Sequence, residues 1–360
     1  MKSFEYIEPI DGLRALAVIG VLMGHWLPSV WSENYARFAD IGLIMFFLIS
    51  GYLITGILLS IRSRIEAGEF SRSYGLRRFY IRRALRIFPL YYFVIIIAIL
   101  GLRLVREDAI PHLFFFQNLS SLSYEPGHYH MASHLWSLAV EEQFYLVWSI
   151  LLLTAPRRLI PIMPWIFISM AYIFKVWCLM TGQSEWFLKV STFGCMDSLA
   201  VGCLVAIAHA NQYTRALRIS RYFSVYLGVG LIFLITLCTS KQVISERILD
   251  YVFYDLSVYC LLWLLLDNAK NNYWKPVNRI LTTKIFIYIG KISYGLYIYH
   301  QFVAWGNKLI LDYLFDLNTD ASGSVLIFIH NFIATILVAH LSWTYFERKI
   351  NNLKEKIASF

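Results

Sequence analysis

Residues 87–102 read IFPLYYFVIIIAILGL and contain no charged side chain, and they directly follow the arginine-rich stretch RRFYIRRALR at 77–86. An α-helix needs about 20 mostly apolar residues to cross roughly 30 Å of membrane hydrocarbon. Arginines are costly inside hydrocarbon and gather at membrane surfaces. The stretch therefore predicts a transmembrane helix at 86–104 that begins at one membrane surface.

Apolar runs of this kind recur along the whole chain. Of the 360 residues 58% are hydrophobic and 15% charged, whereas soluble domains average about 25% charged residues. This composition excludes a soluble enzyme, a disordered chain and a protein with a single anchor. It predicts an all-α integral membrane protein, a polytopic bundle of about ten transmembrane helices. The predicted spans are 10–31, 40–61, 86–104, 134–155, 161–181, 190–209, 222–240, 250–267, 285–303 and 323–345.

The net charge of +9 follows from this topology. With an even number of spans both termini lie on one side of the membrane. If that side is the cytoplasm, most of the 32 lysines and arginines fall on the cytoplasmic side, as the positive-inside rule requires. We therefore predict cytoplasmic termini, contacts with membrane lipids and no nucleic-acid partner. The predicted domains are one transmembrane domain at 1–346 and a short basic cytoplasmic tail at 347–360.

The cysteines indicate packing rather than chemistry. All five fall inside predicted spans, without C-x-x-C spacing and without a neighbouring histidine cluster. They are Cys178, Cys195, Cys203, Cys238 and Cys260. We expect no metal site.

Ionisable residues in the first span are the first candidates for function, because such residues are expensive inside a membrane. Asp11 and Arg14 stand at its cytoplasmic end, and His25 follows eleven residues after Arg14. Eleven helical residues rise about 16 Å and return to within about 20° of the starting direction. Arg14 and His25 therefore share one helix face. Either they serve a functional site, or Arg14 snorkels and pairs with Asp11 while His25 bonds a neighbouring carbonyl.

A second set lies where the fourth span enters from the outer side. His134, Ser137 and Glu141 follow the spacing that places residues on one helix stripe, and Glu142 adjoins them. Two glutamates just inside a membrane need a cavity or a partner. A carboxylate beside His25 could orient its imidazole or act as the base itself. The alternative is an arginine–glutamate lock between helices.

The arginines before the third span form a third set, in the predicted inner loop. Guanidinium groups bind phosphates through two parallel hydrogen bonds. These side chains could therefore receive a polyanionic cytosolic cofactor, or they could contact anionic lipid headgroups. They are Arg77, Arg78, Arg82, Arg83 and Arg86.

Other polar positions within the spans are read first as structural. Ser50 and Gly51 in the second span are small residues that let helix backbones approach closely. Further polar positions, each interpreted as a satisfied contact, are Asp197, Lys291, Ser293, Tyr294, His300 and Glu347.

Taken together, these motifs resemble the membrane-bound acyltransferase-3 family, bacterial integral-membrane enzymes that O-acylate extracytoplasmic glycans. The resemblance covers nearly the whole chain. Its most specific parts are Arg-x10-His at Arg14 and His25, Phe-Phe-x-x-Ser-Gly at 46–51, RIFP at 86–89 and WSLAVEEQFY at 136–145; weaker ones are DSLAVG at 197–202 and GKISY at 290–294 with Tyr297 and His300. One departure is Cys195, where the family often has an arginine. Because only a short tail follows the tenth predicted span, we expect the stand-alone type, without the SGNH-type esterase domain of some relatives.

The resemblance implies an O-acyltransferase, most simply an O-acetyltransferase, of the bacterial cytoplasmic (inner) membrane. Its donor co-substrate would be cytosolic acetyl-CoA or another acyl-CoA, and its acceptor a sugar hydroxyl of a glycan or lipid-linked glycan, such as lipopolysaccharide O-antigen or another surface polysaccharide. His25 would be the general base or a transient acyl carrier, oriented by Glu141 or Glu142. Arg14 and arginines of 77–86 would hold the phosphates of coenzyme A. Residues that would shape the site are Asp11, Ser50, His134, Trp136, Ser137, Tyr145 and His300.

Two other classes of function stay open at this stage. A secondary transporter would show internal repeats and broken helices in matching halves, and neither is visible in the sequence. A non-catalytic partner in glycan export would bind the glycan without using acyl-CoA. The sequence does not identify the acceptor hydroxyl, the acyl chain length or the oligomeric state.

Overall fold

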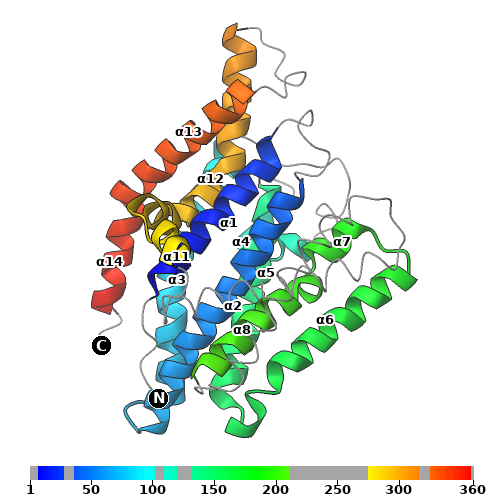
Figure 1. The fold of residues 1–360 in the computed structure, drawn as a ribbon, viewed down its shortest axis with the longest axis vertical. Helices are drawn as coiled ribbons and strands as arrows, with labels where there is room; N and C mark the ends of the chain where they lie inside the picture. Colours follow the sequence, from blue (N-terminus) through cyan, green and yellow to red (C-terminus); the bar gives the residue numbers. More distant parts are fainter. Residues whose placement is uncertain are drawn as a thin grey trace. The chain divides into compact units, whose positions relative to one another are not determined.

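The computed structural model describes residues 7–27, 36–101, 109–119, 132–210, 275–315 and 325–357. These residues form helices joined by turns, and no strand occurs among them, so the all-α prediction is confirmed for this part of the chain (Figure 1). The longer helices are α1 (Glu8–Trp26), α2 (Ala36–Glu66), α3 (Arg72–Gly101), α5 (Trp136–Thr154), α6 (Met163–Met180), α8 (Thr192–Ala210), α12 (Lys284–Phe315) and α13 (Val325–Ser342). The shorter ones are α4 (Ala109–Leu113), α7 (Glu185–Val190), α11 (Lys275–Leu281) and α14 (Arg348–Ile357).

Five segments within the described ranges are long and apolar enough to cross a membrane. They are Phe38–Glu66, Arg72–Leu100, Met163–Met180, Thr192–Ala210 and Val325–Leu353. The chain is thus a multi-pass membrane protein. The number of ten spans and the cytoplasmic termini stay predictions, and the predicted spans at 222–240 and 250–267 lie outside the described residues.

The boundaries of several helices differ from the prediction. The predicted start of the third helix at residue 86 was wrong, because α3 begins at Arg72 and runs without interruption through the arginine stretch at 77–86. The cytoplasmic position of this stretch stays a prediction. Hydropathy marks only the apolar part of a helix, whereas arginine is itself a good helix former. The first helix ends at Trp26 rather than at residue 31. Pro28 follows closely, and a proline disfavours helical geometry in the residue before it.

The chain divides into two compact units. The first unit comprises Met1–Leu13, Ile44–Leu76 and Val140–Ile287, and the second comprises Arg14–Leu43, Arg77–Ala139 and Tyr288–Phe360. Several long helices begin in one unit and end in the other. The unit boundary within α5, for example, falls between Ala139 and Val140.

In the first unit α2 packs closely against α8 and α5. A Cβ atom on Gly51 would collide with the carbonyl oxygen of Leu199, and one on Gly202 would collide with that of Leu48. Such contacts need glycine because only a residue without a side chain lets two helix backbones approach so far. The indole Nε1 of the buried Trp148 donates to Thr55 Oγ1 at 2.9 Å and links α5 to α2.

The second unit is held by polar contacts between its helices. Tyr91 on α3 donates its hydroxyl to the carbonyl of His112 at 2.8 Å, and its ring stacks on Phe115 with 4.4 Å between ring centroids. Tyr294 on α12 donates to the carbonyl of Ile87 on α3 at 2.7 Å. Hydrogen bonds of this kind are an established source of association between helices in a membrane, where the hydrophobic effect does not drive their contact.

Candidate active site

His25 lies in the last turn of α1 and is exposed. The side-chain amide of Gln301 on α12 donates to Nδ1 of His25 at 3.4 Å. Since Nδ1 accepts this bond, the proton of the neutral imidazole lies on Nε2. The ring of His25 is 5.0 Å from the ring of His300, measured between centroids, with 44° between their planes.

His300 is fully buried on α12. Its Nδ1 lies 2.5 Å from the backbone carbonyl oxygen of Tyr297, one turn earlier on the same helix. A carbonyl oxygen can only accept, so Nδ1 of His300 holds the proton and Nε2 carries the lone pair. Nε2 is buried and has no hydrogen-bond partner among the described residues.

His134 completes a cluster of three histidines. Its ring lies 4.6 Å from that of His300 in an edge-to-face arrangement, and its Nε2 donates to the carbonyl of Ile298 at 3.0 Å. The hydroxyl of Tyr297 donates to the carbonyl of His134 at 2.6 Å and accepts from Ser137 Oγ at 2.5 Å. These bonds fix the entry of α5 against α12 within the second unit.

The structure thus brings together four of the predicted site residues in the second unit: His25, His134, Ser137 and His300. Trp136 is also buried there, at the first position of α5. The catalytic roles of these residues stay predictions. The structure shows the exposed imidazole of His25 next to the buried imidazole of His300, which contacts the buried imidazole of His134.

Glu141 belongs to the first unit and is oriented by two hydroxyl donors. Ser50 donates to one carboxylate oxygen at 2.9 Å and Tyr145 donates to the other at 2.7 Å. Ser50 was interpreted as a packing residue, and this hydrogen bond gives its hydroxyl a defined role. Glu142 is half-buried. The predicted partnership of His25 with Glu141 or Glu142 joins residues of different units and stays a prediction.

The cationic candidates lie on α1 and α3. Arg14 is half-buried and Asp11 is buried on α1. On α3 the spacing of four residues places Arg78, Arg82 and Arg86 on one side of the helix. Arg77 and Arg82 are exposed, while Arg78, Arg83 and Arg86 are half-buried. Their binding of phosphate stays a proposal.

Two sets of polar contacts in the second unit were not predicted from the sequence. Gln301, which touches His25, was not singled out, although an amide inside a predicted span is itself a signal. The second is a relay in which Tyr299 donates to Ser342 Oγ at 3.2 Å and Ser342 donates to Glu347 at 2.8 Å. Glu347 ends a π-helical turn, Trp343–Glu347, and such turns occur frequently at functional sites.

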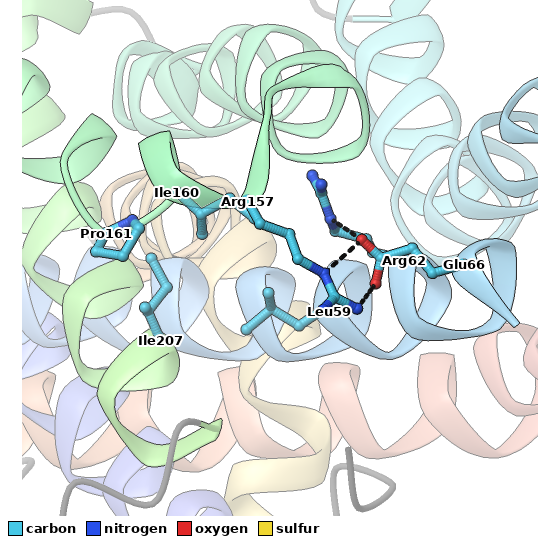
Figure 2. Close-up of a pocket in the computed structure, with 7 residues that line it drawn as sticks. All are labelled: Leu59, Arg62, Glu66, Arg157, Ile160, Pro161 and Ile207. Carbon is cyan, nitrogen blue, oxygen red and sulfur yellow. Dashed lines mark hydrogen bonds and ion pairs between the residues drawn. The ribbon is translucent and has the colours of Figure 1, made fainter.

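A separate cavity of about 370 Å³ lies in the first unit, where α2 ends beside the turn between α5 and α6 (Figure 2). Its apolar walls are Leu59, Ile160, Pro161 and Ile207, and its polar rim is Arg62, Glu66 and Arg157. Arg157 binds both carboxylate oxygens of Glu66, at 3.0 and 2.5 Å, and this hydrogen bonding raises the pKa of the Arg157 guanidinium. Arg62 donates from Nη1 to the carbonyls of Leu152 and Ala155, at 2.6 and 2.8 Å. The polar groups of this rim are thus engaged with one another and with the end of α5.

Fold and site together define a multi-pass helical membrane protein with a histidine cluster between its helices. The chain belongs to the acyltransferase-3 family. The model of this family, described as an acyltransferase domain, matches residues 7–344. Over 83% of the present chain, the sequence is 28% identical to the peptidoglycan O-acetyltransferase OatA of Listeria monocytogenes. Over 100% of the present chain, it is 27% identical to the O-acetyltransferase OatA of Staphylococcus aureus. It spans 49% and 60% of these two relatives. No solved structure matches the fold.

Proposed function

We propose that this chain is a membrane O-acyltransferase that moves an acetyl group from acetyl-CoA, or another acyl group from its coenzyme A thioester, to a sugar hydroxyl of an extracytoplasmic glycan. The observation that carries the proposal is the exposed imidazole of His25. Its ring lies next to the ring of His300, which in turn contacts the ring of His134. Membership in a family of acyltransferase domains supports the reaction class. The proposed location is the bacterial cytoplasmic membrane.

The chemistry needs a base and a stabilised oxyanion. In the proposed reaction the sugar hydroxyl gives its proton to His25 while its oxygen forms a bond to the thioester carbonyl carbon. The carbon–sulfur bond then breaks, and the leaving thiolate takes the proton from His25. Glu141 or Glu142 is proposed to assist this proton transfer with its carboxylate.

The donor would be bound by cations. Arg14 and the arginines of α3 are proposed to hold the phosphates of coenzyme A, because guanidinium groups bind phosphate through two parallel bonds. The acyl group would then approach His25 on α1. Metal ions have no place in this proposal.

The acceptor is proposed to be a surface glycan. One relative is named for peptidoglycan, so peptidoglycan is the first acceptor to test. Lipopolysaccharide O-antigen or another surface polysaccharide, free or lipid-linked, is the second.

The test is an analysis of base-labile esters on surface glycans, by NMR and mass spectrometry. A deletion strain of the source organism is compared with the same strain expressing wild type, His25→Ala or His340→Ala. His340 is exposed on α13, in the same unit, and serves as the control. We expect ester loss in the deletion strain, restored by wild type and His340→Ala but not by His25→Ala. Equal esters in all strains would refute the function, and full restoration by His25→Ala would refute the base.

A further inference from the structure

We infer that His300 is a positioning residue for His25: its buried Nε2 accepts a hydrogen bond from Nε2–H of His25 when the proposed base takes a proton. This inference rests on the proposed function and deepens it. It starts from one atom, the Nε2 of His300, which is buried and has no hydrogen-bond partner among the described residues.

The tautomer of His300 is fixed by its own helix. Nδ1 lies 2.5 Å from the carbonyl oxygen of Tyr297, which can only accept. The hydroxyl of Tyr297 is tied to Ser137 and to the carbonyl of His134, so this turn of α12 is held from the side as well. A neutral His300 therefore presents a lone pair at Nε2. Buried polar atoms are nearly always paired, and an exception calls for an explanation.

Of the two neighbouring imidazoles, His25 can supply the missing hydrogen. Gln301 donates to Nδ1 of His25, which leaves the proton of its neutral ring on Nε2. His134 cannot supply one in its neutral form, because its proton lies on the Nε2 that donates to the carbonyl of Ile298. Of the two rings next to His300, only that of His25 therefore offers a hydrogen to Nε2 of His300.

The distance between the two rings suits such a bond. Their centroids are 5.0 Å apart. An N–H···N hydrogen bond of about 2.9 Å, with about 1.1 Å from each nitrogen to its ring centre, needs a centroid distance of about 5 Å. The separation therefore allows the bond once the exposed His25 ring turns its Nε2 toward His300.

The bond would act in the proton transfer. The acceptor hydroxyl replaces Gln301 at Nδ1 of His25 and gives its proton there as its oxygen bonds to the acyl carbon. The imidazolium so formed carries a positive charge, which strengthens the hydrogen bond from its Nε2–H to His300. When the carbon–sulfur bond breaks, the proton passes from Nδ1 of His25 to the leaving thiolate. His300 keeps its own proton on Nδ1 throughout and stays neutral.

The test uses two variants of the full-length protein in lipid nanodiscs. His300→Phe keeps a ring and removes the acceptor, and His300→Gln keeps an amide oxygen near the position of Nε2. With acetyl-CoA and a soluble glycan fragment we expect His300→Phe to lower kcat by about 10–100-fold with little change in KM, and His300→Gln to recover most of it. His340→Phe, on the exposed histidine of α13, is the matched control and should leave kcat unchanged.

Two further measurements report on His25 without turnover. Carbethoxylation of His25 by diethyl pyrocarbonate, followed by mass spectrometry of its peptide, should be several-fold slower in His300→Phe than in wild type or His340→Phe. In wild type, nitrogen NMR of labelled imidazoles should show the proton of His25 on Nε2. The NMR measurement needs no variant, so it stands even if a substitution prevents folding.

The outcomes separate this inference from the proposed function. A His25 protonated on Nδ1, or wild-type kcat and His25 reactivity in His300→Phe, would overturn the positioning role. Equal loss of kcat in both His300 variants with unchanged His25 reactivity would overturn it as well, because that pattern is structural. Absence of transfer by the wild type would refute the function instead, and the reactivity and NMR measurements would still decide whether the two histidines are coupled.

Discussion

Lys175 on α6 donates a hydrogen bond to Asp197 on α8, and the two side chains are 3% and 1% exposed. The second carboxylate oxygen of Asp197 accepts the backbone N–H of Ser198 at 3.0 Å, and the ammonium of Lys175 lies 5.0 Å from the centre of the Tyr172 ring. Cys195 stands where an arginine is often found in the family that the sequence resembles. In this chain the cation next to Asp197 therefore comes from the neighbouring helix.

Removing one member of this pair should be much worse than removing both. Lys175→Met leaves a buried carboxylate without its cation, which costs about 3–5 kcal/mol for buried pairs. The double variant Lys175→Met with Asp197→Leu should recover most of that loss. Thermal unfolding of the purified protein in detergent measures both.

The control for this pair is Lys275→Met, at an exposed lysine of the same unit, which should leave the melting temperature unchanged. A double variant no more stable than Lys175→Met alone would show that the pair is not coupled in this way.

The class of fold could be read from the sequence because hydrocarbon imposes simple lengths. The apolar run at 87–102 predicted only the apolar part of α3, whereas α6 and α8 lie within two residues of their predicted spans. The helical conformation of the arginine stretch at 77–86 could not be predicted this way, since hydropathy does not detect the charged part of a helix.

Part of the candidate site could be anticipated as well. The predicted topology places His25, His134 and His300 at the outer ends of their spans, and the second unit brings their rings together. Their partners could not be anticipated, because contacts such as Gln301 with His25 depend on the rotation of each helix about its axis. This rotation is set by how the helices pack, and it cannot be predicted from a single sequence.

Substitution of the glycines between α2 and α8 should be strongly destabilising. A methyl group on Gly51 meets the carbonyl oxygen of Leu199, and one on Gly202 meets that of Leu48, so each change forces two backbones apart. We expect Gly51→Ala and Gly202→Ala to cost about 1–3 kcal/mol or more, as overpacking does in dense cores. Gly306→Ala on α12 is the control, since no atom from elsewhere in the described part of the chain lies within 4 Å of its added Cβ. Retention of wild-type stability by Gly51→Ala and Gly202→Ala would argue against this close packing.

Two arginines at the rim of the cavity in Figure 2, Arg62 and Arg157, should differ in their contribution to stability. Arg62 donates to two carbonyls at the end of α5, and its side chain is 11% exposed. Arg157 binds Glu66 from a side chain that is 74% exposed. Arg62→Met should cost about 1–3 kcal/mol, because it removes the donors of two part-buried carbonyls. Arg157→Met should cost much less than Arg62→Met, because exposed ion pairs contribute little.

Urea unfolding of the two variants in mixed micelles measures the difference, with Arg158→Met as the control at a neighbouring exposed arginine. Equal losses for Arg62→Met and Arg157→Met would mean that the contacts to the α5 carbonyls contribute nothing beyond the surface pair.

Glu141 should matter more for transfer than Glu142, because two hydroxyl groups hold its carboxylate in one orientation. Preorganised groups contribute most when their orientation needs no adjustment during the reaction. Under the proposed function we expect Glu141→Gln to lower ester formation by about 10²-fold or more, the size of general acid–base effects. Ester formation by Glu142→Gln should stay within about threefold of wild type. Tyr145→Phe keeps the charge of Glu141 and removes one of its two hydroxyl donors, so its ester formation should fall between those of the two glutamate variants. Base-labile acetate on the glycan measures all three variants at matched protein levels, and the reverse order of the two glutamates would assign the role to Glu142.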